Sequence, residues 1–385
     1  MTEPGLIVIG SGPAGLGAAE AFRKHNSTLP VHLISADPAV PYERPPLSKD
    51  FLRGDTDDVA LHPLSWFSDR EIELVRGAEV DRIDPADGFV VIDGERHFYT
   101  ALVLATGASP SPLPVAGGEQ ALALRSLSDA ERLRTASSDA RSAVVVGGGF
   151  IGCEAAASLA RRGISVTLVA PQDVPQEKRL GSEAGKQLLR LVEDAGVHYV
   201  GGVSVEAVHE GTSVQLDSGV SVGCDLVLAA TGVIPNSGAA EAAGLDIQKS
   251  RVVVGADMAT SAPNVFAAGD VALAYNTSAS RRIAVEHWQD AADQGAIAGA
   301  AAAGGDAKWD AVPGFWTTIG DSDVKYHAWG DGYESSRLLQ RDDGFTVWYE
   351  RDGATVGVLT LNADDDYDLG ERLVKEGAPA PAPTR

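Results

Sequence analysis

Short apolar runs alternate with longer helical patterns in two regions of the chain. Residues 6–22 (LIVIGSGPAGLGAAEAF) and 143–160 (AVVVGGGFIGCEAAASLA) each begin with a β-branched run, pass through a glycine-rich turn and end in an alanine-rich pattern. A further apolar run follows each region, at 31–35 and at 165–170. Strand, turn, helix and strand in this order predict a parallel sheet covered by helices, once in each region.

Two later runs resemble each other, YTALVLATGASP at 99–110 and CDLVLAATGVIP at 224–235, and each predicts a buried strand that ends in Thr-Gly. Residues 77–99 and 202–222 alternate apolar and polar positions around turn residues, which predicts antiparallel hairpins or meanders. After about residue 311, aromatic and β-type patterns precede a last helical pattern, which predicts a small α+β unit.

The predicted fold class is therefore α/β, with two Rossmann-like domains and a small C-terminal α+β domain. The predicted domains are residues 1–108 together with 236–310, residues 109–235, and residues 311–385. A chain of 385 residues is long enough for two or three such domains.

Composition and charge exclude several classes of protein. Hydrophobic residues make up 44% of the chain, which is too many for a disordered protein. The formal net charge is −23, and no basic stripe is present that could bind nucleic acid. No apolar run is long enough to span a membrane, and the N-terminus lacks the basic region of a signal peptide, so we expect a cytoplasmic protein.

Cysteine usage offers neither a disulfide framework nor a metal cluster. The chain has only Cys153 and Cys224, and each follows a glycine beside an apolar run. This placement favours buried packing roles, and we expect no metal site.

The first glycine-rich turn has the pattern Gly10-x-Gly12-x-x-Gly15. In this pattern the first glycine permits a tight turn, the second lets the backbone approach a pyrophosphate, and the third lets helix and strand pack closely. Asp37 follows at the end of the next apolar run, where a carboxylate can accept hydrogen bonds from ribose hydroxyls. The turn therefore predicts a dinucleotide site.

The second turn, Gly147-x-Gly149-x-x-Gly152, also predicts a dinucleotide, but Ala170 stands where the acid is expected. The missing acid weakens the preference for NADH over NADPH. Lys178 and Arg179 lie downstream, where they could meet a 2′-phosphate or form a solvated basic pair. NADH is slightly favoured, because no arginine stands near Ala170.

Two acidic residues have alternative interpretations. Glu154 either complements the dipole of the second helix or faces a nicotinamide, and the sequence does not separate the two. Asp270 ends the apolar run 264–268 in a Gly-Asp pair, which is either a turn or the site of a carboxylate that reaches a cofactor hydroxyl.

Taken together, these motifs resemble those of the flavoproteins with two dinucleotide-binding domains of the glutathione-reductase type. Two segments narrow the resemblance to the ferredoxin reductases of oxygenase systems. Residues 41–49 (PYERPPLSK) resemble the Y-x-R-P-x-L-S-K loop of that group, and residues 286–295 (EHWQDAADQG) resemble a second motif. The resemblance covers nearly the whole chain.

The resemblance implies FAD on the first domain and NAD(P)H on the second. It implies that Arg44 contacts the FAD pyrophosphate or adenosine, and that Lys49 lies by the flavin, paired with Glu154. It also implies backbone contact of Val80 with the adenine and contact of Asp270 with the ribityl chain.

Further along the chain, the resemblance implies that the backbone around Trp288 reaches the flavin pyrimidine. It also implies that Glu286 and Gly232 border the nicotinamide dinucleotide. Lys49 and Glu154 are the predicted catalytic residues. The predicted cofactor-binding residues are Gly10, Gly12, Pro13, Ala14, Gly15, Asp37, Arg44, Lys49, Val80, Ala105, Thr106, Gly107, Gly147, Gly149, Phe150, Ile151, Gly152, Glu154, Gly232, Gly269, Asp270, Glu286, His287 and Trp288.

One segment departs from the family. Ferredoxin reductases of this group often carry a Trp-Phe-Trp-Ser-Asp-Gln run at the start of the third domain, and this chain has Gly-Phe-Trp-Thr-Thr-Ile at 314–319. Phe315 and Trp316 are kept, whereas the first Trp, the Asp and the Gln are lost. This departure bears on the identity of the electron acceptor.

The function that the resemblance implies is hydride transfer from NAD(P)H to FAD, followed by single-electron transfer to a ferredoxin-type iron–sulfur protein that serves an oxygenase or a cytochrome P450. The alternatives are a reductase of rubredoxin or another acceptor, and a redox-sensing NADH-binding flavoprotein like apoptosis-inducing factor. We expect a monomer or homodimer with neither a membrane nor a nucleic-acid partner. Arg281, Arg282 and Lys325 are candidates for a basic docking patch, although scattered surface charges are the simpler explanation.

Overall fold

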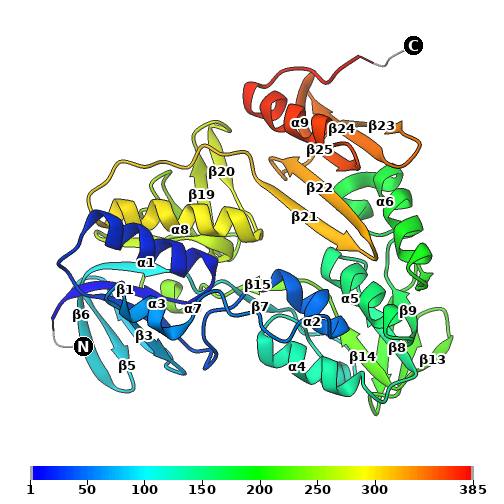
Figure 1. Ribbon diagram of the computed structural model, residues 1–385, viewed down its shortest axis with the longest axis horizontal. Helices are drawn as coiled ribbons and strands as arrows, with labels where there is room; N and C mark the ends of the chain where they lie inside the picture. The colour runs from blue at the N-terminus through cyan, green and yellow to red at the C-terminus, as the bar shows by residue number, and fades with distance from the viewer. Residues whose placement is uncertain (1–2, 383–385) are drawn as a thin grey trace.

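The computed structural model describes residues 3–382 (Figure 1). Its helices and strands form two units based on parallel sheets and a third unit based on an antiparallel sheet. None of the described helices is both long enough and apolar enough to cross a membrane.

The first parallel sheet has the strand order β3-β2-β1-β6-β18. Its strands are β1 (Gly5–Ile9), β2 (Val31–Ser35), β3 (Ile72–Arg76), β6 (Glu95–Leu104) and β18 (Val265–Ala267). The last strand comes from a distant part of the chain and pairs with β6. β1, β2, β18 and the last four residues of β6 are buried on both faces, which is the pattern of a parallel sheet covered by helices, whereas the edge strand β3 is partly exposed.

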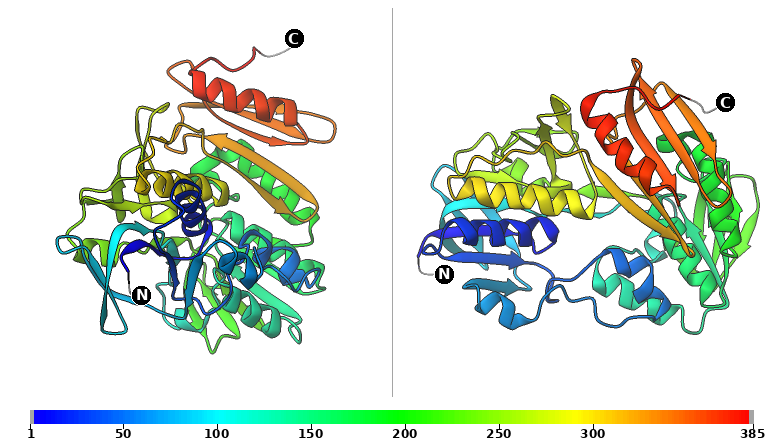
Figure 2. Two further views of the ribbon diagram at one scale, coloured as in Figure 1. Left: turned by 60° about the vertical axis from the view of Figure 1, so that its left-hand side comes forward. Right: turned by 45° about the horizontal axis from the view of Figure 1, so that its top comes forward.

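Two helices, α1 (Pro13–His25) and α8 (Trp288–Ala302), lie side by side over this sheet, as Figure 1 and the right-hand view of Figure 2 show. Small residues permit the close crossing. A Cβ atom added to Gly295 would stand 2.0 Å from the carbonyl oxygen of Ala14, and one added to Gly299 would stand 2.1 Å from that of Ala18. Glycine is therefore required at both positions.

Antiparallel strands extend the first unit. β4 (Val80–Asp84) and β5 (Phe89–Ile92) pair with each other and with the start of β6, which confirms the meander predicted for residues 77–99. A separate sheet that the sequence pattern did not reveal has the order β16-β17-β19-β20. Its strands are β16 (Ile247–Gln248), β17 (Arg251–Val254), β19 (Ala272–Asn276) and β20 (Arg281–Ile283).

The second parallel sheet has the strand order β10-β9-β8-β14. Its strands are β8 (Ser142–Val146), β9 (Ser165–Val169), β10 (His198–Val200) and β14 (Leu226–Ala229), and its long helices are α4 (Leu127–Ala136), α5 (Phe150–Arg161) and α6 (Glu177–Asp194). An antiparallel meander of β11 (Val205–His209), β12 (Ser213–Leu216) and β13 (Ser221–Gly223) confirms the pattern predicted for 202–222.

A two-stranded ribbon carries the chain between these units. β7 (Ala108–Pro110) pairs antiparallel with β15 (Val233–Pro235). The side chain of Asn236 reinforces the crossing, because it donates 2.9 Å to the carbonyl oxygen of Thr106 and accepts 2.8 Å from the hydroxyl of Ser109. The chain thus passes out along one strand and returns along its neighbour.

The third unit is an antiparallel sheet with the order β21-β22-β25-β24-β23 (Figure 2). Its elements are β21 (Gly314–Ile319), β22 (Ser322–Ala328), β23 (Ser335–Gln340), β24 (Phe345–Arg351), β25 (Ala354–Leu361) and the helix α9 (Asp364–Glu376). The short elements of the remaining chain are the helices α2 (Asp50–Arg53), α3 (Leu64–Ser68) and α7 (Gly238–Ala242), and the single 3₁₀ turns Pro45–Ser48, Gly118–Gln120 and Gly269–Val271. The predicted fold class is confirmed.

Candidate functional site

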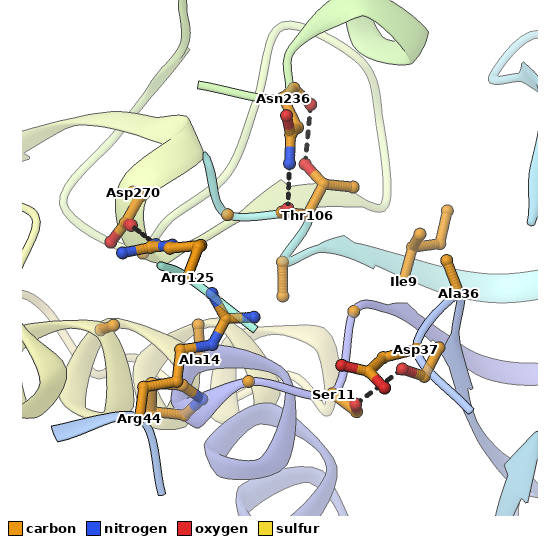
Figure 3. A pocket seen from close by; sticks show the side chains of 18 of the residues that line it. Ile9, Ser11, Ala14, Ala36, Asp37, Arg44, Thr106, Arg125, Asn236 and Asp270 are labelled. Carbon is orange, nitrogen blue, oxygen red and sulfur yellow. Dashed lines mark hydrogen bonds and ion pairs between the residues drawn. The ribbon is translucent and has the colours of Figure 1, made fainter. Parts of the chain in front are cut away.

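A cavity of about 590 Å³ opens at the carboxyl ends of β1, β2 and β6 (Figure 3). Ligands of open parallel sheets bind at this edge. Eighteen of the predicted site residues line the cavity, and they come from segments far apart in the sequence. They are Gly10, Gly12, Pro13, Ala14, Asp37, Arg44, Lys49, Val80, Ala105, Thr106, Gly107, Ile151, Glu154, Gly269, Asp270, Glu286, His287 and Trp288.

The first glycine turn shapes one end of this cavity. Gly10 has a φ of +105°, and an added Cβ would stand 2.1 Å from the carbonyl oxygen of Ala105. A Cβ on Gly15 would stand 1.8 Å from the carbonyl oxygen of Gly10, so Gly15 serves packing and does not line the cavity. Gly12 has nothing within 4 Å of its added Cβ, and it caps α1 without a side-chain bond to the helix. The N-terminus of α1 is therefore open to a bound anion.

Asp37 is held by a residue to which sequence reasoning gave no role. Its Oδ2 atom accepts a hydrogen bond of 2.8 Å from the hydroxyl of Tyr42, and its Oδ1 atom accepts one of 2.9 Å from the backbone N–H of Ala39. Burial raises the pKa of Tyr42 to about 12, so the phenol keeps its proton and remains a donor. Its oxygen also accepts a bond of 2.9 Å from the N–H of Leu127.

Two arginines face one carboxylate in the middle of the cavity (Figure 3). Arg125 is ion-paired with Asp270, and its Nε atom donates 3.1 Å to the carbonyl oxygen of Ala108. The side chain of Arg44 makes no hydrogen bond or ion pair with any residue between 3 and 382. Burial lowers the pKa of Arg44, and the nearby charge of Arg125 lowers it further. The surplus of positive charge suits a bound diphosphate.

Arg125 was missed by sequence reasoning. It stands in the segment just before α4, and no motif marks that segment. Its partner Asp270 is distant in the chain, so only the folded structure brings the two together.

Lys49 and Glu154 form a buried ion pair, as the resemblance implied. The Nζ atom of Lys49 lies 2.7 Å from Oε2 of Glu154, and the carboxylate is 5% exposed. The hydroxyl of Ser48 donates to the same oxygen at 2.5 Å, and the hydroxyl of Thr317 donates to Oε1 at 2.6 Å. α5 has no acidic residue in its first turn, so the helix-dipole interpretation of Glu154 loses its basis.

A second cavity, of about 320 Å³, adjoins the first. It lies beside the N-terminus of α5 and the end of β14, and the predicted residues Gly149, Phe150 and Gly232 line it. Gly232 has a φ of +102° and open space where a side chain would stand. Five predicted residues line both cavities, namely Ile151, Glu154, Glu286, His287 and Trp288. Two bound groups would therefore meet beside Glu154.

Gly147 and Gly152 line neither cavity. An added Cβ on Gly147 would stand 2.3 Å from the carbonyl oxygen of Ala230, and one on Gly152 would stand 2.0 Å from that of Gly147. These two glycines permit close packing of strand, turn and helix. Ala170 is fully buried, and its Cβ lies 3.1 Å from the position of an added Cβ on Gly148.

Arg179 and His287 lie where the cavities meet. The Nδ1 atom of His287 is 2.9 Å from Oδ2 of Asp290, and its Nε2 atom is 3.2 Å from Nη2 of Arg179. The imidazole packs 4.6 Å from the ring of Phe315, and the guanidinium lies 5.5 Å from the same ring. Trp316, the next residue, is 54% exposed and lines the second cavity.

The proposed docking patch is largely neutralised. Arg281 is paired with Asp331 at 2.6 Å, and Lys325 is paired with Asp364 at 2.8 Å. The structure therefore favours the simpler explanation of scattered surface charges.

The cysteines take no part in the site. Cys153 and Cys224 are both free and buried, and burial raises the pKa of Cys153 to about 12. A thiol held in this way is not a nucleophile at neutral pH. Among residues 3–382 no cluster of side chains could hold a metal ion.

The two cavities adjoin each other, and each lies beside a glycine turn at the end of a parallel sheet. This arrangement defines a protein that binds two nucleotides, one end of each meeting the other. The model of the pyridine nucleotide-disulphide oxidoreductase family matches residues 4–295, and the chain belongs to this family.

Its relatives include ferredoxin reductases. The chain is 32% identical over 396 residues to a ferredoxin–NAD(P)⁺ reductase of Sphingomonas sp, covering 98% of this chain and 94% of the relative. It is 31% identical over 392 residues to the ferredoxin–NAD⁺ reductase component of the anthranilate 1,2-dioxygenase system of Burkholderia cepacia, covering 98% and 96%. A chain of the covalent putidaredoxin reductase–putidaredoxin complex superposes with a TM-score of 0.93 at 28% identity, covering 98% and 94%.

Proposed function

We propose that this chain is an NAD(P)H-dependent ferredoxin reductase that carries electrons through FAD to a ferredoxin-type iron–sulfur protein serving an oxygenase or a cytochrome P450. The observation that carries the proposal is the meeting of two nucleotide cavities beside the buried Lys49–Glu154 pair. The ferredoxin reductases among its relatives support the same acceptor class.

The residues of the first cavity fit FAD. The open N-terminus of α1 at Gly12 and the surplus charge of Arg44 and Arg125 suit its diphosphate. We assign residues 1–108 and 236–310 to FAD binding, residues 109–235 to NAD(P)H binding, and residues 311–385 to a C-terminal domain. When bound, FAD supplies the chemistry of accepting two electrons from a nicotinamide and releasing them one at a time.

The chain contributes alignment and charge. Glu154 lines both cavities and holds the ammonium group of Lys49 in the first, where a fixed positive charge stabilises negative charge that develops during reduction. Ile151, Glu286 and Trp288 line both cavities and so help to align the two bound groups with each other. None of these steps requires a covalent nucleophile, in agreement with the buried thiol of Cys153.

NADH is the coenzyme that we propose. The end of β9 offers the buried Ala170 and no arginine that could meet a 2′-phosphate. Arg179 instead lies at the junction, beside His287 and Phe315. We further propose a cytoplasmic protein, monomeric or homodimeric, that binds neither membranes nor nucleic acid.

The test is anaerobic stopped-flow reduction of the purified protein with NADH and NADPH in parallel, followed by mixing with a ferredoxin. We expect bound flavin that NADH bleaches rapidly, and then electron transfer to the ferredoxin. A protein that purifies with flavin but bleaches with neither coenzyme would contradict the proposal. Rapid bleaching of the flavin without reduction of the ferredoxin would contradict only the proposed identity of the acceptor.

A further inference from the structure

Thr317 connects the third unit to the centre of the site. Along β21, Trp316 is exposed and Thr317 is 1% exposed, and both residues line the second cavity. The hydroxyl of Thr317 donates a hydrogen bond of 2.6 Å to Oε1 of Glu154. The bond joins residues 163 positions apart in the sequence.

Both oxygens of the Glu154 carboxylate are thereby held from different parts of the chain. Oε1 has the hydroxyl of Thr317, whereas Oε2 has the hydroxyl of Ser48 and the ammonium group of Lys49. A buried carboxylate that lost one of these donors would be free to rotate and would be incompletely satisfied. Its hold on Lys49 would then be looser.

We propose that Thr317 is a positioning residue, whose hydroxyl fixes the Glu154 carboxylate at the junction of the two cavities so that Lys49 is held in place in the first cavity. The third unit is then part of the redox centre, because one of its strands orients the ion pair. This inference rests on the proposed function, since it takes the position of Lys49 to matter for flavin reduction.

The chain offers a matched control on the same strand. The hydroxyl of Thr318 also donates 2.6 Å to a carboxylate, that of Asp323, but Thr318 lines neither cavity and its bond is exposed. Thr317→Val and Thr318→Val therefore remove hydrogen bonds of equal length from the same strand. Thr317→Ser keeps the hydroxyl and removes only a methyl group.

The experiment compares these three variants with the wild type as flavin-loaded proteins. For Thr317→Val we expect the limiting rate of flavin bleaching by NADH to fall about tenfold, the effect of one lost hydrogen bond to a charged group. The NADH concentration at half-saturation should change less than about twofold, since Thr317 is almost fully buried and its hydroxyl is engaged by Glu154. The midpoint potential of the bound flavin should become more negative, because Lys49 would stabilise the reduced state less. Thr318→Val and Thr317→Ser should retain the wild-type rate and potential.

The inference is wrong if Thr317→Val keeps both the wild-type limiting rate and the wild-type potential while the wild type itself is rapidly reduced. A drop in thermal stability without a change in potential would likewise assign Thr317 a structural role only. If the wild type is not reduced by NADH or NADPH, the proposed function fails instead.

Discussion

The buried pair of Lys49 and Glu154 depends on both partners, because their side chains are 12% and 7% exposed. Lys49→Met would leave the carboxylate of Glu154 charged and without its cation, although Ser48 and Thr317 still donate to it. We expect unfolding in urea to show a loss of about 3 kcal/mol.

The double variant Lys49→Met, Glu154→Leu is the control for this prediction. It removes both charges from the buried site, so it should be destabilised less than Lys49→Met alone. Equal stability of the wild type and the single variant would show that the carboxylate is solvated in solution.

Arg179 lies at the junction of the cavities and pairs with no carboxylate of residues 3–382. Arg179→Gln should raise the KM for NADH and NADPH alike, by about fivefold, because a guanidinium there contacts the part that the two coenzymes share. The control is Lys178→Gln, whose exposed neighbouring side chain does not line the cavity and whose KM values should stay unchanged. Steady-state kinetics with both coenzymes would contradict the placement if only the KM for NADPH rose.

Individual site residues can be predicted from the sequence where the signal is local. Gly10, Gly12 and Gly15 lie within one turn, and their spacing predicts a dinucleotide cradle; Gly10 and Gly12 line the first cavity, whereas Gly15 serves packing. Arg125 and Thr317 carry no such signal, because each is defined by a carboxylate more than a hundred residues away. A sequence pattern cannot reveal a contact that only the assembled sheets create.

At the scale of single elements, β21 and β22 show how the chain accommodates its departure from the family run. A Cβ added to Gly314 would stand 2.3 Å from the imidazole of His327, its cross-strand partner. His327 therefore occupies space next to the position where the family often has tryptophan. Its ring stacks on Tyr367 of α9 with the centroids 4.2 Å apart.

This packing makes the stability of the third unit sensitive to pH. Burial lowers the pKa of His327 below its ordinary value, and Glu371 and the carbonyl oxygen of Pro313 only partly oppose the effect. Below about pH 6.5 the unfolded chain binds a proton that the folded state resists, so stability is full above that pH and falls as the pH drops towards 5. Urea unfolding at pH 7 and pH 5 measures the difference.

His327→Gln should reduce that pH dependence, whereas His209→Gln, at an exposed strand end, should leave it unchanged. Part of the dependence should persist in both variants, because burial also lowers the pKa of His32 in the first sheet. An unchanged slope in His327→Gln would show that His327 binds its proton equally well in the folded and unfolded states.

The strands of the parallel sheets were the easiest elements to predict, since each is an uninterrupted apolar run beside a glycine turn. The sheet of β16, β17, β19 and β20 escaped prediction because its strands have two to five residues and lack a clear alternation. The break in α6 at Gly181, where φ is +81°, also carries no helix-stop signal beyond the glycine itself. The hydroxyl of Tyr349 from β24 donates to the carbonyl oxygen of Leu180 at this break, at 3.0 Å.

For the whole molecule, the net charge of −23 governs encounters with charged partners. Of the three candidate docking residues, Arg281 and Lys325 are neutralised by aspartates and only the exposed Arg282 has no ion pair with residues 3–382, so we expect the overall repulsion of an acidic ferredoxin to dominate. The rate of ferredoxin reduction at low concentration should therefore rise between about 20 and 200 mM salt, as screening weakens the repulsion.

Reduction of an uncharged quinone by the same protein serves as the control and should be insensitive to salt. A ferredoxin reduction rate that falls steadily with salt would reveal an attractive surface that outweighs the net charge.

At the scale of the whole molecule the sequence predicts three units, because each predicted domain has its own periodicity. The contact between the third unit and Glu154 could not be predicted from the sequence.

The strand order of the first sheet has a consequence for synthesis. β18 completes that sheet, and α8 completes the pair of helices that covers it. Both elements follow every strand of the second sheet in the chain. On the ribosome, the second unit can form while the first still lacks a strand and one of its two packed helices. Because translation adds roughly 5–20 residues per second, the nascent chain remains without a finished flavin cradle for several seconds. We therefore expect the prosthetic group to bind late. In a chain stalled before β18, the second unit should be folded while the first unit remains incomplete.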